Sequence, residues 1–144
     1  MWLIDRFARL FTLLFLIGAL SATATARVSN PEPAAEAAAA KWLALVDAGK
    51  YNRSWIQAAS YVRQTVAQAA WSSSVAAARA QCGPLQARRL ASAYVTSYLP
   101  DSPDGHYVVI HYSSQFARKK KVVETLTMVE QSPNQWRVIG YYIN

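Results

Sequence analysis

Glu124 is the residue whose type and position are best suited to acid–base chemistry. It alternates with Val122, Leu126 and Met128, so on a strand it would share their side and face an apolar interior. A carboxylate in that position needs a cationic partner, or its pKa rises. A perturbed acid in a cleft can serve as a general base.

Two arginines, Arg79 and Arg88, could pair with that carboxylate. Structural ion pairs also perturb acids, so we favour a structural Glu–Arg pair over a catalytic acid. The alternative is a pocket for a small ligand or substrate, lined by Glu124 together with Tyr112 and Tyr141. An enclosed apolar cavity of about 300 Å³ or more with Glu124 at its wall would favour the pocket.

Other reactive groups stand alone. Cys82 is the only cysteine, so no disulfide forms within the chain, and we expect a small, half-buried residue at a helix end. His106 and His111 are five apart and would point to opposite faces of a strand. Neither a G-x-S-x-G elbow nor a phosphate-binding glycine loop is present. We therefore expect no catalytic residue, metal or cofactor.

The N-terminal residues have the pattern of a secretory signal peptide. Arg6 and Arg9 precede an apolar run, L-F-T-L-L-F-L-I-G-A-L, which is followed by S-A-T-A-T-A. The run is short for a membrane span, which needs about 20 residues, so an uncleaved anchor is the weaker alternative. We expect cleavage after Ala24 or Ala26, a signal peptide over residues 1–26, no stable membrane span afterwards, and a periplasmic location.

The remaining chain predicts a short linker, residues 27–33, and a single α+β domain, residues 34–144. Apolar residues at helical spacing predict helices over about 34–48 and 67–81, with Gly49 and Gly83 at their ends. Another helix is expected to start at Ser54, which has Gln57 at the spacing of a capping box.

The C-terminal half is rich in Val, Ile, Thr, Tyr and Phe, and P-D-S-P-D-G, A-R-K-K-K and S-P-N separate its apolar stretches. Short connections imply antiparallel hairpins. We therefore predict three helices packed on one face of a four-stranded antiparallel meander. Its strands are expected at Ala87–Leu99, Tyr107–Phe116, Val122–Gln131 and Gln135–Ile143.

Side-chain parity assigns the faces of this sheet. If the S-P-N turn pairs Gln131 with Trp136, the core face gains Ile139, Tyr141 and Ile143. The same register opposes Met128 to Ile139, Leu126 to Tyr141 and Glu130 to Arg137, and Ala91, Ala93, Val95 and Leu99 complete the core face. A one-residue slip would exchange the two faces.

The other face would be unusually aromatic for a solvated sheet. Such a patch is typical of an interface, although rings lying flat on their neighbours would also explain it. Its members, the interface candidates, are Tyr94, Tyr98, Tyr107, His111, Trp136 and Tyr142.

The formal charge is +7, and it becomes +6 once Asp5, Arg6 and Arg9 leave with the signal peptide. Arg88-Arg89 and the R-K-K-K run at 118–121 carry much of it. A basic surface favours polyanions, and export argues against a dedicated nucleic acid partner. Weak binding to anionic envelope polymers therefore remains open, with a solvated hairpin turn as the commoner explanation of the run.

A set of landmarks resembles the bacterial domain-of-unknown-function family 4019 over nearly the whole mature chain. Its members are exported and of unknown function, so the resemblance implies no catalytic residue. Helices followed by a sheet ending in W-R-V are also similar to the nuclear-transport-factor-two-like fold, which does not fix function. The landmarks are K-W-L from Lys41, D-A-G from Asp47, Tyr51, Trp55, Trp71, Arg79, Gly83, Arg88, P-D-G from Pro103, Tyr107, Phe116, E-T from Glu124, W-R-V from Trp136 and G-Y from Gly140.

These features favour a small periplasmic binding or assembly module without catalysis. Its aromatic face would pair with a second copy or with another envelope protein. The rival from a different class is the small-ligand carrier or pocket enzyme around Glu124.

Overall fold

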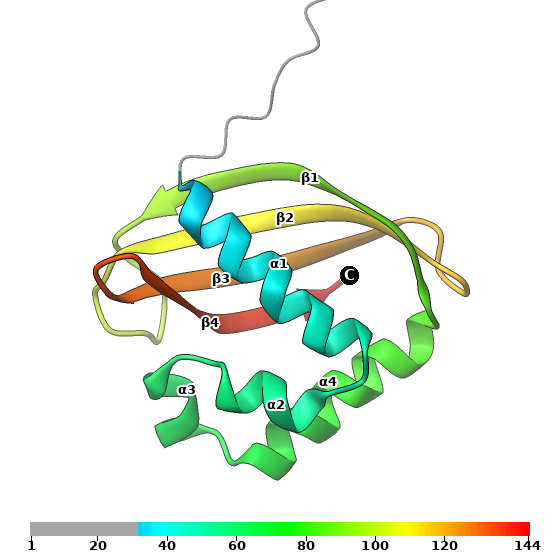
Figure 1. Ribbon diagram of the computed structural model, residues 1–144, viewed down its shortest axis with the longest axis horizontal. Coiled ribbons are helices and arrows are strands. Elements are labelled where there is room, and N and C mark those ends of the chain that lie inside the picture. Colours follow the sequence, from blue (N-terminus) through cyan, green and yellow to red (C-terminus); the bar gives the residue numbers. More distant parts are fainter. Residues whose placement is uncertain (1–31) are drawn as a thin grey trace, which may run out of the picture.

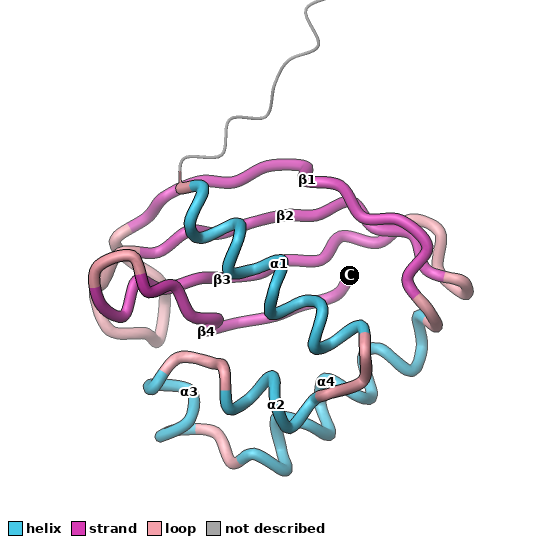
Figure 2. Tube along the Cα trace, in the orientation of Figure 1, coloured by secondary structure: helices cyan, strands magenta, loops and turns pink. Residues whose placement is uncertain are grey.

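The computed structural model describes residues 32–144, so the predicted signal peptide and nearly all of the predicted linker lie outside the described residues. Helices come first and strands follow (Figures 1 and 2). The helices are α1 (Pro33–Asp47), α2 (Tyr51–Ile56), α3 (Ser60–Thr65) and α4 (Gln68–Cys82). The strands are β1 (Leu85–Thr96), β2 (Tyr107–Phe116), β3 (Val122–Ser132) and β4 (Gln135–Ile143).

The four strands form one antiparallel sheet in the order β1-β2-β3-β4, so the predicted meander and the α+β class are confirmed. Helix α1 lies across one face of this sheet, the inner face, while α2, α3 and α4 lie beyond β4 (Figure 1). Ala35 and Ala39 are fully buried, and their small side chains let α1 approach the strands closely.

The helix ends follow the glycine pattern, but the middle of the helical region does not follow the prediction. Gly49 and Gly83 both have positive φ, as helix-terminating glycines do. The capping box is wrong, because α2 begins three residues earlier and buried Ser54 donates its hydroxyl to the Tyr51 carbonyl.

A loop divides the predicted second helix into α2 and α3 (Figure 2). There Ala58 forms a parallel bridge with Val138, and the N–H of Ala59 donates to the Val138 carbonyl at 2.8 Å. The loop backbone therefore supplies a donor for the Val138 carbonyl on the free edge of β4. A continuous helix could not supply it, because its backbone N–H groups bond within the helix.

The register of β4 departs from the prediction because one residue is extra. Leu126 faces Tyr141 as expected, but Met128 faces Val138 and Glu130 faces Trp136. Ile139 is the bulged residue, and the predicted Glu130–Arg137 pairing is wrong. The bulge turns Trp136 and Val138 to the inner face while keeping Tyr141 there.

Strand β1 has a similar irregularity between Leu90 and Ser92. Leu90 and Ala93 pack against the core, whereas Ala91 and Val95 are exposed, so the predicted core set for this strand is only partly right. The sheet's main core comes from the other strands, with Val108, Ile110, Leu126 and Met128 under α1.

Candidate functional site

Glu124 is fully buried at the centre of a hydrogen-bonded group of charged and polar side chains. The Arg88 guanidinium donates two hydrogen bonds to it, from Nε to Oε2 at 2.6 Å and from Nη2 to Oε1 at 3.0 Å. Ser114 Oγ donates to Oε2, and Tyr141 OH donates to Oε1 at 2.6 Å. Arg79 Nη1 lies 3.7 Å from Oε1. Each carboxylate oxygen thus accepts two hydrogen bonds.

Asp47, the last residue of α1, joins the same group from the surface side. It accepts hydrogen bonds from Arg79 Nη1 at 2.7 Å and from Arg88 Nη1 at 2.8 Å. We call Asp47, Arg79, Arg88, Ser114, Glu124 and Tyr141 the arginine cluster. Its two guanidinium groups and two carboxylates balance in charge, which limits the cost of burying them.

The pKa shifts in the arginine cluster follow from burial and pairing. Burial alone would raise the pKa of Asp47, but hydrogen bonds from Arg88 and Arg79 outweigh it and lower that pKa. Burial, followed by the Glu124 carboxylate, raises the pKa of Tyr141. Tyr141 therefore stays a neutral donor to Glu124.

The arginine cluster ties together most of the domain. Arg88 comes from β1, Ser114 from β2, Glu124 from β3 and Tyr141 from β4, while Asp47 and Arg79 come from α1 and α4. Arg79 also stacks on the Phe116 ring, with its Cζ 4.6 Å from the ring centroid. With both carboxylate oxygens of Glu124 occupied, this arrangement fits a structural brace better than a general base.

Tyr112, the other predicted pocket residue, does not join this network. It is buried on the inner face, and its hydroxyl has no hydrogen-bond partner within the described residues. Burial, with smaller contributions from nearby charges, raises the pKa of Tyr112 to about 12. Sequence reasoning thus found Glu124, Arg79, Arg88 and Tyr141, which the fold brings together, and Tyr112 lies opposite Glu124 in the sheet without a hydrogen bond to it.

Two of the predicted interface residues are buried. Tyr107 is 2% exposed because the loop after β1 folds over it: its hydroxyl donates to the Pro103 carbonyl, and its ring lies against Gly105. Trp136 is 5% exposed because the bulge at Ile139 turns it to the inner face. The prediction that these two rings form an exposed aromatic surface is wrong.

The other interface candidates remain at the surface. Tyr98 and Tyr142 are each 65% exposed and Tyr94 is 50% exposed. The His111 ring lies 6.2 Å from that of Tyr94, and its Nδ1 is 3.0 Å from Thr125 Oγ1.

The strand pairings place two of these tyrosines in two uncharged rows across the outer face of the sheet. One row runs Ser92, His111, Thr125 and Tyr142, and the next runs Tyr94, Val109, Thr127 and Gly140. We call these eight residues the outer patch, although Val109 and Thr127 in its second row are buried. With neutral histidine, it spans all four strands without a charge, although the chain has 15 Lys and Arg and 8 Asp and Glu residues.

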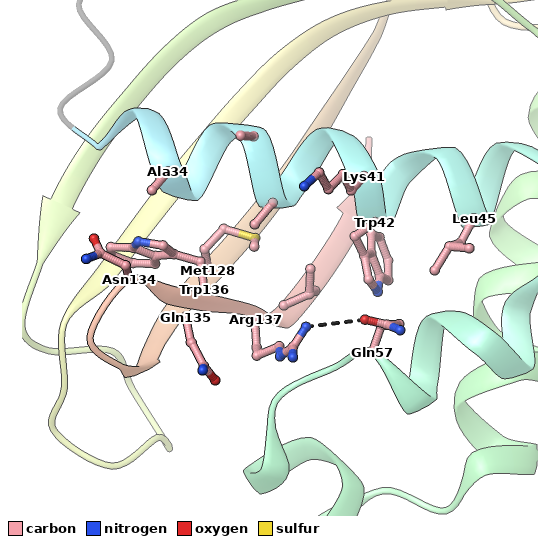
Figure 3. Close-up of a pocket in the computed structure, with 13 residues that line it drawn as sticks. Ala34, Lys41, Trp42, Leu45, Gln57, Met128, Asn134, Gln135, Trp136 and Arg137 are labelled. Atoms are coloured by element: carbon pink, nitrogen blue, oxygen red, sulfur yellow. Dashed lines mark hydrogen bonds between the residues drawn. The ribbon is translucent and has the colours of Figure 1, made fainter.

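A groove with a volume of about 730 Å³ lies between α1 and the first half of β4 (Figure 3). Trp42, Met128, Trp136 and Val138 give it apolar walls. Its remaining lining residues are Ala34, Ala37, Ala38, Lys41, Leu45, Gln57, Asn134, Gln135 and Arg137. Arg137 Nη1 donates to Gln57 Oε1 at 3.2 Å, as the dashed line in Figure 3 shows.

A smaller hollow of about 190 Å³ lies between α4 and the end of β4. Tyr141 lines it, but Glu124 lines neither this hollow nor the groove. The groove was not predicted, because it depends on the bulge that brings Trp136 under α1. The three alanines on the groove side of α1 were the available signal, since a helix side without large residues leaves space beside it.

The described residues also answer the remaining questions about chemistry. His106 and His111 lie on opposite faces as predicted, with His106 Nδ1 2.8 Å from Glu130 Oε2. Cys82 is fully buried at the end of α4. Within residues 32–144, potential metal-binding side chains do not gather in groups of three, and no helix is long and apolar enough to cross a membrane.

Comparison with protein families supports the resemblance seen in the sequence. The family described as "Protein of unknown function (DUF4019)" matches residues 38–141, which include β1 to β3, most of β4 and most of α1. The chain belongs to the DUF4019 family. No match was found to a curated protein or to a solved structure. For this DUF4019 domain, the likeness to nuclear-transport-factor-two-like domains therefore stays a prediction.

Proposed function

We propose that this protein is an exported, non-catalytic binding module that associates through the outer patch. The observation that carries the proposal is the pair of uncharged rows on the outer face, with Tyr94 exposed on the edge strand β1 and Tyr142 exposed on the edge strand β4. Exposed aromatic rings on a surface without charge are typical of protein interfaces. The periplasm is the expected location, on the basis of the signal-peptide pattern in residues 1–26.

A second copy of the chain is the first partner that we propose for the outer patch, because this surface brings no charges of two copies face to face. The formal charge of +6 on the chain without its predicted signal peptide, which is +7 less the net +1 of Asp5, Arg6 and Arg9, makes two copies repel each other over most of their surfaces. The outer patch adds nothing to this repulsion, and a two-fold dimer brings the same patch together on both copies. Another envelope protein could use the same uncharged surface.

The geometry gives less support to a pocket enzyme or ligand carrier around Glu124. That carboxylate lines neither hollow described, and its two oxygens already accept four hydrogen bonds. For binding to anionic envelope polymers, the basic run at 118–121 is exposed and available. Arg88 is not available, because its guanidinium pairs with Asp47 and Glu124.

The experiment compares sedimentation of the native protein with a variant carrying Tyr94→Ser and Tyr142→Ser. We expect the native protein to self-associate and the double variant to be monomeric with an unchanged thermal midpoint. Ile56→Ser is the matched control, since Ile56 is a 53% exposed apolar residue on α2, outside the sheet. Equal association of the native protein and the double variant would refute the proposal.

Export is tested separately by fusing residues 1–26 to a reporter that is active only outside the cytoplasm. We expect activity with the native segment and none when the apolar run is interrupted by two arginines. An inactive native fusion would contradict the proposed location.

A further inference from the structure

The groove between α1 and β4 has the chemistry of a second binding site, separate from the outer patch. We propose that it binds an extended acidic peptide segment of a partner protein, with carboxylates at Lys41 and Arg137 and an apolar side chain between the indoles of Trp42 and Trp136.

The walls of the groove are firmly held without a ligand. Trp42, Met128, Trp136 and Val138 are each at most 5% exposed, so they are packed on their other sides. Trp42 Nε1 donates to the Ser54 carbonyl at 2.9 Å, which fixes its ring. A groove of about 730 Å³ lies in the size range of ligand sites, which is about 300–1,000 Å³.

Helix α1 keeps the groove open along its length. Ala34, Ala37, Ala38, Lys41 and Leu45 share the side of the helix that lines it, while Ala35, Ala39, Leu43 and Val46 are buried. The groove side extends over about 16 Å at 1.5 Å per residue. An extended segment of about five residues has that length.

The cations of the groove lack carboxylate partners. Within the described residues, neither Lys41 nor Arg137 forms a salt bridge, and no Asp or Glu lines the groove. Arg137 makes one hydrogen bond, to the neutral Gln57 amide, so most of its five N–H donors stay available. Glu130, which accepts the backbone N–H of Asn134 at the groove's end, is already paired with His106.

The neutral polar groups in the groove favour a peptide over a simple anion. Gln57, Asn134 and Gln135 carry side-chain amides, which both donate and accept and so match the two groups of a peptide bond. The indole N–H groups of Trp42, Trp55 and Trp71 all donate within the protein. Within residues 32–144, that of Trp136 has no acceptor, and a peptide carbonyl or carboxylate would supply one.

The test measures binding of the fluorescently labelled peptide Glu-Leu-Glu-Phe-Glu to the purified protein, beside its counterpart with Gln at each Glu. We expect the acidic peptide to bind at least about tenfold more tightly, as charge-assisted hydrogen bonds predict, and to weaken with salt. Arg137→Glu should reduce its affinity about tenfold or more. Ala37→Trp, which fills the groove, should abolish binding.

Matched controls separate the groove from general effects. Ala40→Trp adds the same ring at an exposed α1 position outside the groove lining, and Lys119→Glu reverses an exposed cation in the β2–β3 turn. Both should bind as the native protein does. Circular dichroism and thermal midpoints establish that each variant is folded.

Three results would overturn the proposal. These are equal affinity for the acidic and the Gln peptides, native-like binding by Ala37→Trp, and no binding of the acidic peptide at about 1 mM, the weak end of specific recognition. A dodecanoate competition arm distinguishes a lipid carboxylate. Binding of dodecanoate in the groove without binding of the peptide would reject a peptide partner.

Discussion

The arginine cluster and the groove both contain two cationic side chains, yet the two regions treat them in opposite ways. Arg79 and Arg88 lie against Asp47 and Glu124, so positive and negative groups balance. In the groove, Lys41 and Arg137 share their surroundings with amides, indoles and alanines. The comparison shows how one domain can use cations both to hold its elements together and to keep a surface attractive to anions.

Removing Glu124 is expected to have the largest effect on stability and so tests most directly whether the arginine cluster holds the fold together. Glu124→Ala removes two of the four hydrogen bonds that Arg88 makes to carboxylates, those to Asp47 remaining, and it also takes the acceptor from the Ser114 and Tyr141 hydroxyls. Losing one partner of a buried ion pair costs roughly 3–5 kcal/mol. We expect a loss of that size in the free energy of unfolding, measured with urea. A loss below about 1 kcal/mol, the scale of exposed pairs, would show that the cluster is not a brace.

Acid should weaken the cluster through Asp47. The folded pKa of Asp47 is lowered from the model-peptide value of 3.8, so its pairing contributes stability at higher pH. That stability is lost as pH falls below 3.8 and through the lowered folded pKa. We expect Asp47→Asn, which cannot ionise, to have a smaller drop in thermal midpoint between pH 5 and pH 2 than the native protein. Parallel pH curves would rule out this contribution.

The smallest effect is expected in the groove, where a cation does not support the fold. Lys41 is exposed and has no salt bridge within residues 32–144. Lys41→Ala should therefore change the free energy of unfolding by no more than about 0.5 kcal/mol, again measured with urea. A loss of 2 kcal/mol or more, as for a buried pair, would remove the distinction between the two regions.

The fold was predictable where local chemistry decides it. Gly49, Gly83 and the turn residues mark element ends whatever the tertiary structure, and the limits of β2 and β4 agree with the prediction. Glu124 was recognised because a charge among alternating apolar residues needs a partner wherever the strand lies. Its pairing with Arg88 required that the Arg88 side chain on β1 reach across β2 to β3 on the same face of the sheet.

The errors come from features that depend on distant parts of the chain. No local signal states that Ile139 will be the extra residue, although a glycine inside a strand, here the neighbouring Gly140, often marks a bulge. That one residue moved Trp136 from the predicted outer face to the groove. Tyr107 was misplaced because its cover comes from the loop after β1, whose path is set by contacts such as that between the Tyr61 hydroxyl and the Asp101 carbonyl.

The bulge at Ile139 makes β4 behave as two half-strands of opposite phase. The first half turns Trp136 and Val138 toward α1, and the second turns Tyr141 toward Glu124. Pairing Ile139 in regular alternation after Val138 would send Tyr141 outward and draw Tyr142 in, with no change in composition. The groove and the arginine cluster therefore share one side of the sheet because Ile139 lies outside the strand pairing, and a register of β4 without this bulge would separate them.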